Sequence, residues 1–223
     1  MLSVKHGTSA MANNVRQLIL GSQSARRREL LEMTGIKFMI MVSDEPEDES
    51  PLDLTGVELA GDTDRGTGVV PKVANIAARK ALAVKKRCLA EGMKNCVILG
   101  ADTVVALGSE LIGKPRDLDD AKRILTRLSG TTHQVVTAYV ICESDTDRML
   151  IRPTISDVTF RPLHEWEIDE YVHGSEVLDK AGAYGIQEKA ALFVDRIDGN
   201  FHNIVGLPVV HLREDLGKFG ITL

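Results

Sequence analysis

The feature that most constrains the fold of this chain is the run at residues 96–107 (CVILGADTVVAL), which is apolar at almost every position. Such a run is typical of a strand buried on both faces, because a half-exposed strand alternates apolar and polar residues. The run contains a single charged residue, Asp102. A carboxylate among apolar side chains is unfavourable unless a metal ion, a lysine or a position at the strand end compensates for it. We therefore expect a sheet covered by helices, with Asp102 either at a functional crevice or in a structural turn.

Strands and helices alternate in the first half of the chain, and strands cluster in the second half. This order predicts an α/β fold with a mixed, curved central sheet flanked by helices. Apolar periodicity predicts helices at 28–33, 72–91, 117–128, 162–173 and 211–219. Short apolar runs predict strands at 17–21, 37–42, 96–107, 133–142, 151–160, 193–197 and 205–210.

The length of 223 residues and the hydrophobic content of 43% suffice for the core of one domain, or of two lobes that share a cleft. We expect residues 1–17 to form a disordered leader and residues 18–223 to form one domain. The stretch 51–71 contains four glycines and several charges and is too long for an ordinary connection. It is therefore predicted to be an insertion.

The charge, the cysteines and the apolar runs exclude several classes of protein. The net charge of -5 gives no support for a nucleic-acid-coating surface, although it permits a local basic pocket. No two of the three cysteines have CxxC spacing, so neither a disulfide scaffold nor a structural zinc site is indicated. No apolar run has the length of a membrane span, and no signal-peptide core precedes the first strand. These observations predict a cytoplasmic protein with neither a nucleic-acid nor a membrane partner.

Polar residues follow the first predicted strand at Ser22, Ser24, Arg26 and Arg27. At a helix N-terminus, free backbone N–H groups, two hydroxyls and two guanidinium groups could bind phosphate oxygens together. Alternatively, Ser24 only caps the helix and the arginines face water. The spacing GxxxxGK[ST] is absent, so this segment is not a Walker loop.

Three further charged residues are candidates for a site. Lys114 follows Asp102 after a short predicted hairpin, although most lysines are simply solvated. Lys80 lies on or beside the apolar face of the helix predicted at 72–91, where it either reaches water or points into a cleft. Glu47 belongs to an acidic run that could supply a metal ligand or form a solvated loop.

Three familiar kinds of site are excluded by their missing patterns. The histidines lack the HExxH spacing of a metal centre. No GxSxG pattern indicates a serine nucleophile, and no GxGxxG follows a strand as in a dinucleotide-binding domain. The charged candidates above are therefore the best indication of chemistry.

Several segments of the chain, taken in order from about Leu18 to Val210, resemble the Maf family of nucleotide pyrophosphatases. They are 22–31 (SQSARRRELL), 77–81 (AARKA), 99–105 (LGADTVV), 113–117 (GKPRD), 128–137 (LSGTTHQVVT), 179–187 (DKAGAYGIQ) and 199–208 (GNFHNIVGLP). The resemblance implies an α/β fold with two lobes around a cleft, similar to that of inosine triphosphatases. It also implies a hydrolase that releases pyrophosphate from a nucleoside triphosphate, a divalent cofactor that is Mg²⁺ or Mn²⁺, and a homodimer.

The resemblance assigns roles to the charged candidates. Asp102 would activate the attacking water or bind the metal, and Glu47 would be a second metal ligand. Lys80 and Lys114 would offset charge on the phosphate oxygens. The residues that would hold the triphosphate are Ser22, Ser24, Arg26 and Arg27.

The resemblance is to the branch of the family that acts on dTTP and UTP. Within that branch Arg26, Thr103 and Gln187 would shape selection of the base. Two alternatives stay open at this point. One is a pyrophosphatase that acts on inosine or xanthosine triphosphate, and the other is a non-catalytic regulator of cell division that binds nucleotides.

Overall fold

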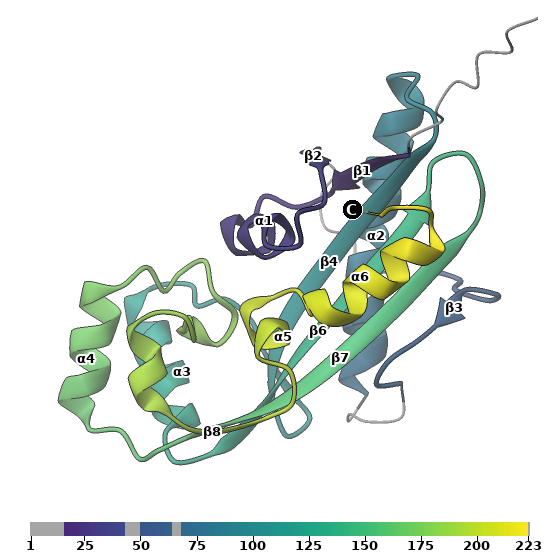
Figure 1. Ribbon diagram of the computed structural model, residues 1–223. Coiled ribbons are helices and arrows are strands. Elements are labelled where there is room, and N and C mark those ends of the chain that lie inside the picture. Colours follow the sequence, from purple (N-terminus) through teal and green to yellow (C-terminus); the bar gives the residue numbers. More distant parts are fainter. Residues whose placement is uncertain (1–15, 43–49, 64–67, 223) are drawn as a thin grey trace, which may run out of the picture.

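The computed structural model describes residues 16–42, 50–63 and 68–222. At its centre, three long strands lie side by side, each antiparallel to its neighbour, and curve along their length (Figure 1). With five shorter strands they form one eight-stranded sheet that has both parallel and antiparallel pairs. The mixed, curved sheet predicted from the sequence is thereby confirmed. The long strands are β4 (Cys96–Leu107), β6 (Thr132–Glu143) and β7 (Met149–Phe160).

Short strands extend both edges of this ladder. They are β1 (Gln17–Leu20), β2 (Phe38–Ile40), β3 (Glu58–Leu59), β5 (Glu110–Ile112) and β8 (Val194–Asp198). On the outer edge of β4, β1 pairs with residues 96–99 and β5 pairs with residues 105–107. Within the described part of the chain, no strand pairs with residues 100–104 at that edge. The sheet edge is therefore open where Asp102 lies.

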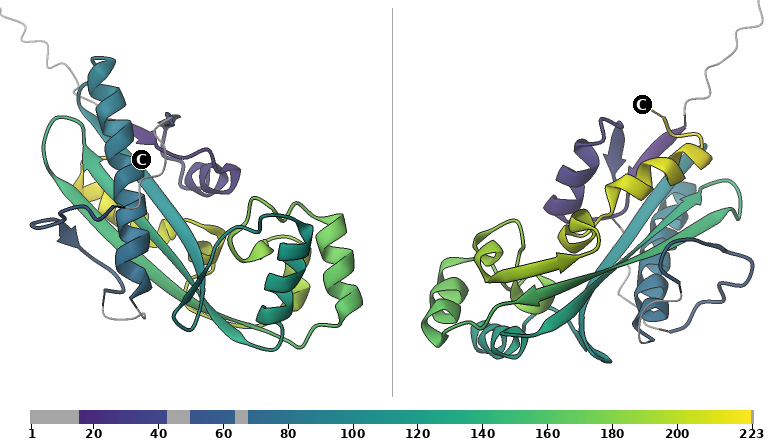
Figure 2. Two further views of the ribbon diagram at one scale, coloured as in Figure 1. Left: turned by 180° about the vertical axis from the view of Figure 1, so that it is seen from behind. Right: turned by 60° about the horizontal axis from the view of Figure 1, so that its bottom comes forward.

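One face of the sheet is covered by the long helix α2 (Val69–Ala90), which crosses behind the strands in Figure 1 and in front of them in the left view of Figure 2. The helix packs on β4 at Gly100, where an added Cβ would lie 2.9 Å from the Ala77 carbonyl oxygen and 2.8 Å from the Ala81 nitrogen. Any larger residue would push the helix away, so Gly100 permits this close approach.

The helix α2 begins three residues before the predicted start at residue 72. Val69 and Val70 are buried and extend the apolar face by a further turn. Pro71 does not prevent this, because N–H groups in the first turn of a helix have no partner within the helix.

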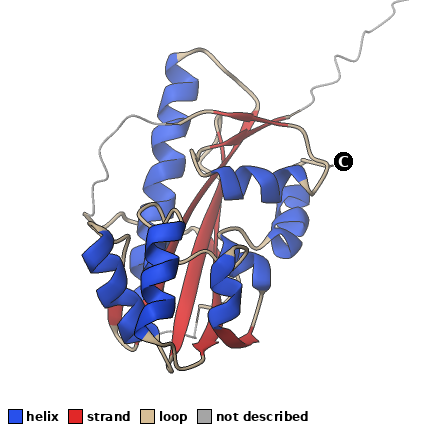
Figure 3. Cartoon of the chain, turned by 90° about the vertical axis from the view of Figure 1, so that its left-hand side faces the viewer, coloured by secondary structure: helices blue, strands red, loops and turns tan. Residues whose placement is uncertain are grey.

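Helices lie on both sides of the strands (Figure 3), and on the face opposite α2 they form two groups. α1 and α6 lie near one end of the long strands and α3 and α4 near the other, with α5 between them (Figure 1). These two groups of helices correspond to the two predicted lobes. The helices are α1 (Ala25–Glu32), α3 (Leu118–Leu128), α4 (Glu165–Gly174), α5 (Phe201–Val205) and α6 (Val209–Lys218), with the short 3-10 helices η1 (Ala181–Ala183) and η2 (Lys189–Phe193).

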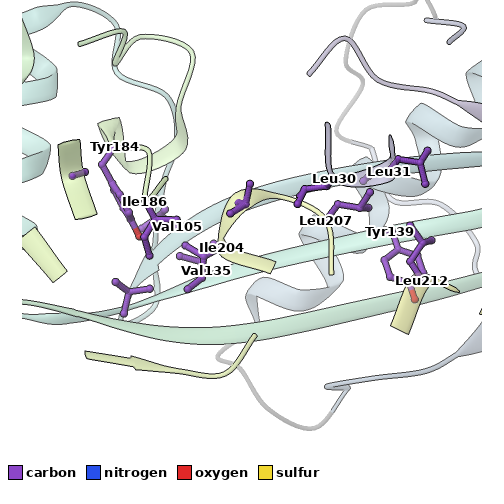
Figure 4. Close-up of a cluster of buried hydrophobic side chains, with 14 of the residues drawn as sticks. Leu30, Leu31, Val105, Val135, Tyr139, Tyr184, Ile186, Ile204, Leu207 and Leu212 are labelled. Atoms are coloured by element: carbon purple, nitrogen blue, oxygen red, sulfur yellow. The ribbon is translucent and has the colours of Figure 1, made fainter. Parts of the chain in front are cut away.

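A continuous apolar core joins the two groups of helices to the sheet. It extends from Tyr184 and Ile186 at one end, through Ile204, to Tyr139 and Leu212 at the other (Figure 4). A second core lies between α2 and the other face of the sheet. The apolar run of β4 contributes alternate side chains to both cores, which explains its near-continuous hydrophobicity.

The strand predicted at residues 205–210 is wrong. Val205 ends α5 and Val209 begins α6, so these residues join two helices. Asn200 caps α5 through its side-chain oxygen, and Gly206 ends the helix with a φ of 126°. A short apolar run fits a buried helix end as well as a buried strand, so its composition could not separate the two.

The predicted leader and the predicted insertion both contain residues that belong to the fold. Gln17 is the first residue of β1, and Arg16 donates a hydrogen bond to the Phe219 carbonyl oxygen at 3.1 Å. In the stretch 51–71, Glu58–Leu59 forms β3 and pairs with β7. Residues 1–15 and 64–67 lie outside the described residues.

Candidate active site

Asp102 and Lys80 form an ion pair at the open stretch of β4. Lys80 Nζ lies 2.7 Å from Asp102 Oδ1, and the two side chains are 29% and 15% exposed. β4 directs Asp102 toward α2, and the close packing at Gly100 brings Lys80 within reach. The lysine therefore supplies the compensation that a carboxylate in an apolar strand requires. Burial along β4 is interrupted at residues 102–104, so the pair is open to a ligand.

The N-terminus of α1 lies at the same opening. Gly21 N donates to the Leu99 carbonyl oxygen at 2.8 Å, which fixes the loop beside β4. Ser24 then caps the helix by accepting a hydrogen bond from Arg27 N, and its own N–H donates to Ser22 Oγ at 3.2 Å. The cap starts α1 at Ala25, three residues before the predicted start, so both arginines belong to the first turn.

Arg27 connects this loop to β4 and α5. Its guanidinium donates to Thr103 Oγ1 at 2.9 Å, to the Gly206 carbonyl oxygen at 3.0 Å and to Ser22 Oγ at 3.3 Å. Burial lowers the pKa of Arg27 below its usual value; the charge of Asp102 opposes that shift and the charge of Arg26 adds to it. Three fixed acceptors hold the side chain in one orientation, so Arg27 is a rigid cation at the site.

The open stretch of β4 and the start of α1 face a cavity of about 380 Å³. Eight predicted site residues line it: Ser24, Arg26, Arg27, Lys80, Asp102, Thr103, Lys114 and Gln187. Ser22 is buried behind the cavity wall, where it accepts the hydrogen bonds from Ser24 and Arg27. Glu47, the predicted metal ligand, lies outside the described residues.

The cavity combines a charged region with an apolar wall. Its cations outnumber its carboxylates, although the whole chain has a net charge of -5. The cations are Arg26, Arg27, Lys80, Lys114 and Lys180, and the carboxylates are Asp102, Asp179 and Glu188. The apolar wall includes Val105, Val135, Ile186 and Ile204, which Figure 4 shows side by side. Such a cavity suits a ligand with an anionic end and a flat, apolar end.

Three charged lining residues were missed by the sequence analysis. Asp179 accepts a hydrogen bond from Arg26 Nη1 at 3.2 Å, across the cleft from α1. Lys180 is only 3% exposed, and its Nζ lies 3.0 Å from Asp179 Oδ1 and 3.4 Å from Glu188 Oε1. Burial raises the pKa of Asp179, but the hydrogen bond from Lys180 and the charge of Arg26 outweigh it, so that the pKa lies below its usual value. The segment 179–187 resembles the Maf family, and the adjacent Asp179 and Lys180 within it were the available signal.

Two buried polar residues behind Thr103 were also missed. Thr137 on β6 lies opposite Thr103, with its Oγ1 2.9 Å from Thr103 Oγ1. Thr137 Oγ1 donates to the Asn203 carbonyl oxygen at 2.9 Å, and Thr137 N donates to the Asn203 side chain at 3.2 Å. Both residues are 0% exposed. A threonine in a strand and an asparagine in a helix carry no pattern that would single them out.

Metal-binding side chains do not cluster in the described part of the chain. No group of three or more histidine, cysteine, aspartate or glutamate side chains there could hold a metal ion. Asp102 is the described member of the predicted ligand pair. Its Oδ1 accepts a hydrogen bond from Lys80, so Oδ2 is the oxygen that could coordinate a metal ion at the cavity.

The described part of the chain contains no helix that is both long enough and apolar enough to cross a membrane.

The fold and the cavity define a class of protein: an α/β protein with a cleft in which cations outnumber carboxylates, beside a lysine-paired carboxylate. The chain belongs to the family described as Maf-like protein, whose family model matches residues 17–219. The comparisons with relatives refine this assignment.

Several curated relatives match the chain over most of their length. It is 38% identical over 208 residues to the dTTP/UTP pyrophosphatase of Dictyoglomus thermophilum, and the match covers 93% of this chain and 98% of that protein. It is 41% identical over 204 residues to the protein of the same name from Cupriavidus metallidurans, covering 92% and 97%. The chain is 39% identical over 214 residues to the protein of the same name from Bacillus cereus, and the match covers 94% of this chain and 93% of that protein. The structure of the Staphylococcus aureus Ham1 protein matches 65% of this chain and 72% of that one with a TM-score of 0.37 and 11% identity, too little to carry an argument.

Proposed function

We propose that this chain is a nucleoside triphosphate pyrophosphatase that hydrolyses dTTP and UTP to the monophosphate and pyrophosphate. The observation that carries the proposal is the carboxylate of Asp102, paired with Lys80 at 2.7 Å and open to a cavity in which cations predominate. A carboxylate that was neither a base nor a metal ligand would only repel the phosphates of a bound triphosphate. The relatives named dTTP/UTP pyrophosphatase support the choice of substrate.

The triphosphate would bind at the start of α1. Free N–H groups of the first turn and the partial positive charge of the helix favour an anion there. Arg27 presents a fixed guanidinium, and Ser24 lines the cavity beside it. Lys114 also lines the cavity and lies on the exposed loop after β5. Ser22 would act through Arg27 and the loop, since it lies behind the cavity wall.

The chemical step would be attack of water on the α-phosphorus. A bond forms between the water oxygen and the α-phosphorus, the bridging bond to the β-phosphate breaks, and pyrophosphate leaves with the electron pair. Asp102 would orient the water and accept its proton. If Asp102 held the divalent metal instead, the metal would make the water more acidic and the proton would pass to solvent. Lys80 and Lys114 would neutralise charge on the phosphate oxygens as the bond breaks, because this reaction depends mainly on positioning and electrostatics.

A divalent metal ion, Mg²⁺ or Mn²⁺, is part of the proposal. Mg²⁺ usually keeps several waters and is held by one or two carboxylates together with the phosphates of the substrate. The single described carboxylate at the open stretch, Asp102, fits that mode of binding, and Glu47 would be the second ligand. When bound, the metal would neutralise phosphate charge. Removal of divalent ions with a chelator should abolish turnover, and addition of Mg²⁺ or Mn²⁺ should restore it; full turnover in the chelator would contradict this part.

Base selection would depend on Arg26, Thr103 and Gln187, which line the cavity. Arg26 is held by Asp179 across the cleft, so it is positioned before a nucleotide binds. Gln187 lies on the exposed loop after η1 and carries both donors and an acceptor. The apolar wall of the cavity would contact the face of the base.

The proposal includes a homodimer, which the resemblance implies, and a cytoplasmic location, which the sequence pattern predicts. Light scattering coupled to size-exclusion chromatography measures the mass of the particle. A mass twice that of the 24.4 kDa chain is expected, and a monomer at micromolar concentration would contradict the dimer.

The experiment that tests the proposed function is pyrophosphate release from a panel of nucleotides: dTTP, UTP, CTP, ATP, GTP, ITP and XTP. We expect dTTP and UTP to be hydrolysed fastest and Asp102→Asn to lose about 10³-fold or more in kcat. A preference for ITP or XTP would move the protein to the purine-specific alternative. Nucleotide binding without turnover in any divalent metal would favour the non-catalytic regulator.

A further inference from the structure

We propose that Thr137 is a positioning residue that turns the hydroxyl of Thr103 so that it offers the cavity an acceptor, which selects the N3–H group of uracil and thymine. Thr137 is buried on β6 and does not line the cavity, whereas Thr103 does. The inference rests on the proposed function, because it concerns how the same cavity recognises its base.

Three contacts form a continuous chain of hydrogen bonds. Arg27 Nη2 lies 2.9 Å from Thr103 Oγ1, which lies 2.9 Å from Thr137 Oγ1, which lies 2.9 Å from the Asn203 carbonyl oxygen. The two ends of the chain have fixed roles, because a guanidinium only donates and a carbonyl only accepts. All the hydrogen atoms along the chain therefore point in one direction, from Arg27 toward Asn203.

The direction follows from the number of hydrogens. Each threonine hydroxyl has one hydrogen and two acceptor positions. Thr137 gives its hydrogen to Asn203, so Thr103 must be the donor in the contact between the two hydroxyls. Arg27 occupies one acceptor position of Thr103. One acceptor position of Thr103 is then left for a ligand, and no donor.

The opposite direction makes fewer bonds in the free protein. If Thr137 turned its hydrogen to Thr103, the bond to the Asn203 carbonyl oxygen would be lost, and the Thr103 hydrogen would need a ligand as its acceptor. A lost hydrogen bond is unfavourable at a buried group, and Thr137 is 0% exposed. The fold thus favours Thr103 as an acceptor before any ligand binds.

The surroundings of Thr137 hold this chain in place. Thr103 and Thr137 are directly opposite in the pairing of β4 with β6. The Asn203 side chain accepts from Thr137 N at 3.2 Å and donates to the Val135 carbonyl oxygen at 3.0 Å and to Ser156 Oγ at 2.9 Å. α5 is therefore fixed to both β6 and β7, and its carbonyl group cannot move away from Thr137 easily.

An acceptor at Thr103 distinguishes between pyrimidine bases. Uracil and thymine carry a hydrogen on N3, whereas cytosine carries a lone pair there. A site built to bond a particular hydrogen discriminates strongly against an analogue that lacks it, because the acceptor of the site is then left without a partner. Thr103 would pair with N3–H of UTP or dTTP and would face the lone pair of CTP.

The test compares kcat/KM for UTP and CTP in wild-type protein and in Thr137→Val. Valine keeps the shape of threonine but removes the hydroxyl, so the Thr103 hydrogen becomes free to turn toward a ligand. We expect the UTP-to-CTP ratio to fall by about tenfold or more, mainly because KM for CTP falls while kcat for UTP stays within about threefold. Thr137→Ser, which keeps the hydroxyl, should retain the wild-type ratio.

A purely structural role for Thr137 would lower both rates together and leave the ratio unchanged, and that result would overturn the proposal. Thr137→Ala provides a second variant without the hydroxyl if valine prevents folding, with the same expectation. A wild-type protein that hydrolyses UTP and CTP equally well would also overturn it. Failure of the proposed function has a different signature, since wild-type protein would then hydrolyse neither UTP nor dTTP.

Discussion

Adjacent residues of β4 carry different kinds of interaction on the two faces of the sheet. Asp102 faces α2 and pairs with Lys80, whereas Thr103 faces α5 and bonds Arg27 and Thr137. Both side chains reach one cavity because the sheet edge is open at residues 100–104. The comparison indicates that the strand divides the site into a chemical face and a recognition face. Substitutions on the two faces should therefore change different kinetic parameters.

Among the substitutions that compare the two faces, the largest effect is expected from Lys80→Met on the chemical face. Methionine keeps much of the length of lysine but lacks its positive charge. The negative charge on the phosphate oxygens is then less stabilised in the transition state, so kcat for UTP should fall by about 10²- to 10³-fold. The UTP-to-CTP ratio should not change. Lys72→Met, an exposed position on the same helix, should leave kcat within about twofold. Steady-state kinetics on both nucleotides checks the comparison, and a changed ratio in Lys80→Met would show that the faces are coupled.

A second ion pair, between Arg152 and Asp215, lies outside the cavity lining and allows a structural charge to be compared with the functional pair. Asp215 of α6 is 0% exposed and accepts from Arg152 at 2.6 and 3.0 Å and from the Tyr139 hydroxyl at 2.6 Å. Asp215→Asn should reduce the free energy of unfolding by about 3 kcal/mol, because the partly buried Arg152 loses its counter-charge. Urea denaturation measures this loss. kcat of the folded variant should stay near that of wild type, and Glu170→Gln, at an exposed position on α4, should change neither quantity.

The same carboxylate predicts a pH dependence of stability. Burial raises the pKa of Asp215, but hydrogen bonds from Arg152, Tyr139 and Lys218 outweigh it and lower the pKa from 3.8 to about 2. Because the folded-state pKa is depressed, the contribution is fully present above about pH 4 and is lost as the pH falls toward 2, a change of about 2 kcal/mol. The difference in unfolding free energy between wild type and Asp215→Asn should therefore shrink over that range, and a difference that stays constant would contradict this origin.

Gly100→Ala tests how the chemical face is assembled. The added Cβ would clash with backbone atoms of Ala77 and Ala81, so α2 must shift away from β4. We expect a loss of about 1–3 kcal/mol in stability, together with a lower kcat because Lys80 moves with the helix. Gly217→Ala, in α6, meets no atom within 4 Å of the added Cβ and should leave kcat unchanged. Thermal unfolding and UTP turnover would distinguish these outcomes.

The smallest kinetic effect is expected from Arg27→Lys, at the residue that joins the proposed triphosphate-binding loop to Thr103. A lysine retains the charge but cannot contact Thr103, Ser22 and the Gly206 carbonyl oxygen together. KM for UTP should rise by about tenfold, with kcat within about threefold. Arg28→Lys, at the next and exposed position of α1, should leave KM unchanged. An effect of Arg27→Lys on kcat alone would place this arginine on the chemical face.

The sequence indicated best those charged residues that interrupt an apolar pattern, although it did not indicate Asp179, Lys180 or Glu188. Asp102 could be found because a carboxylate interrupts an apolar strand, and Lys80 because it interrupts the apolar face of a helix. Thr137 and Asn203 could not be found in the same way, since their role arises from strand register and from the position of α5, which short-range patterns do not encode. The strand expected at 205–210 failed for a related reason: a short apolar run is compatible with either buried structure.

The most direct test of the division between the two faces is a set of four proteins: wild type, Lys80→Met, Thr137→Val and the double variant, each measured for kcat/KM with UTP and CTP. The account predicts that Lys80→Met lowers both rates equally, that Thr137→Val lowers the UTP-to-CTP ratio, and that the double variant combines the two effects multiplicatively. If Lys80→Met changes the ratio as much as Thr137→Val does, chemistry and recognition do not separate across β4, and the account is contradicted.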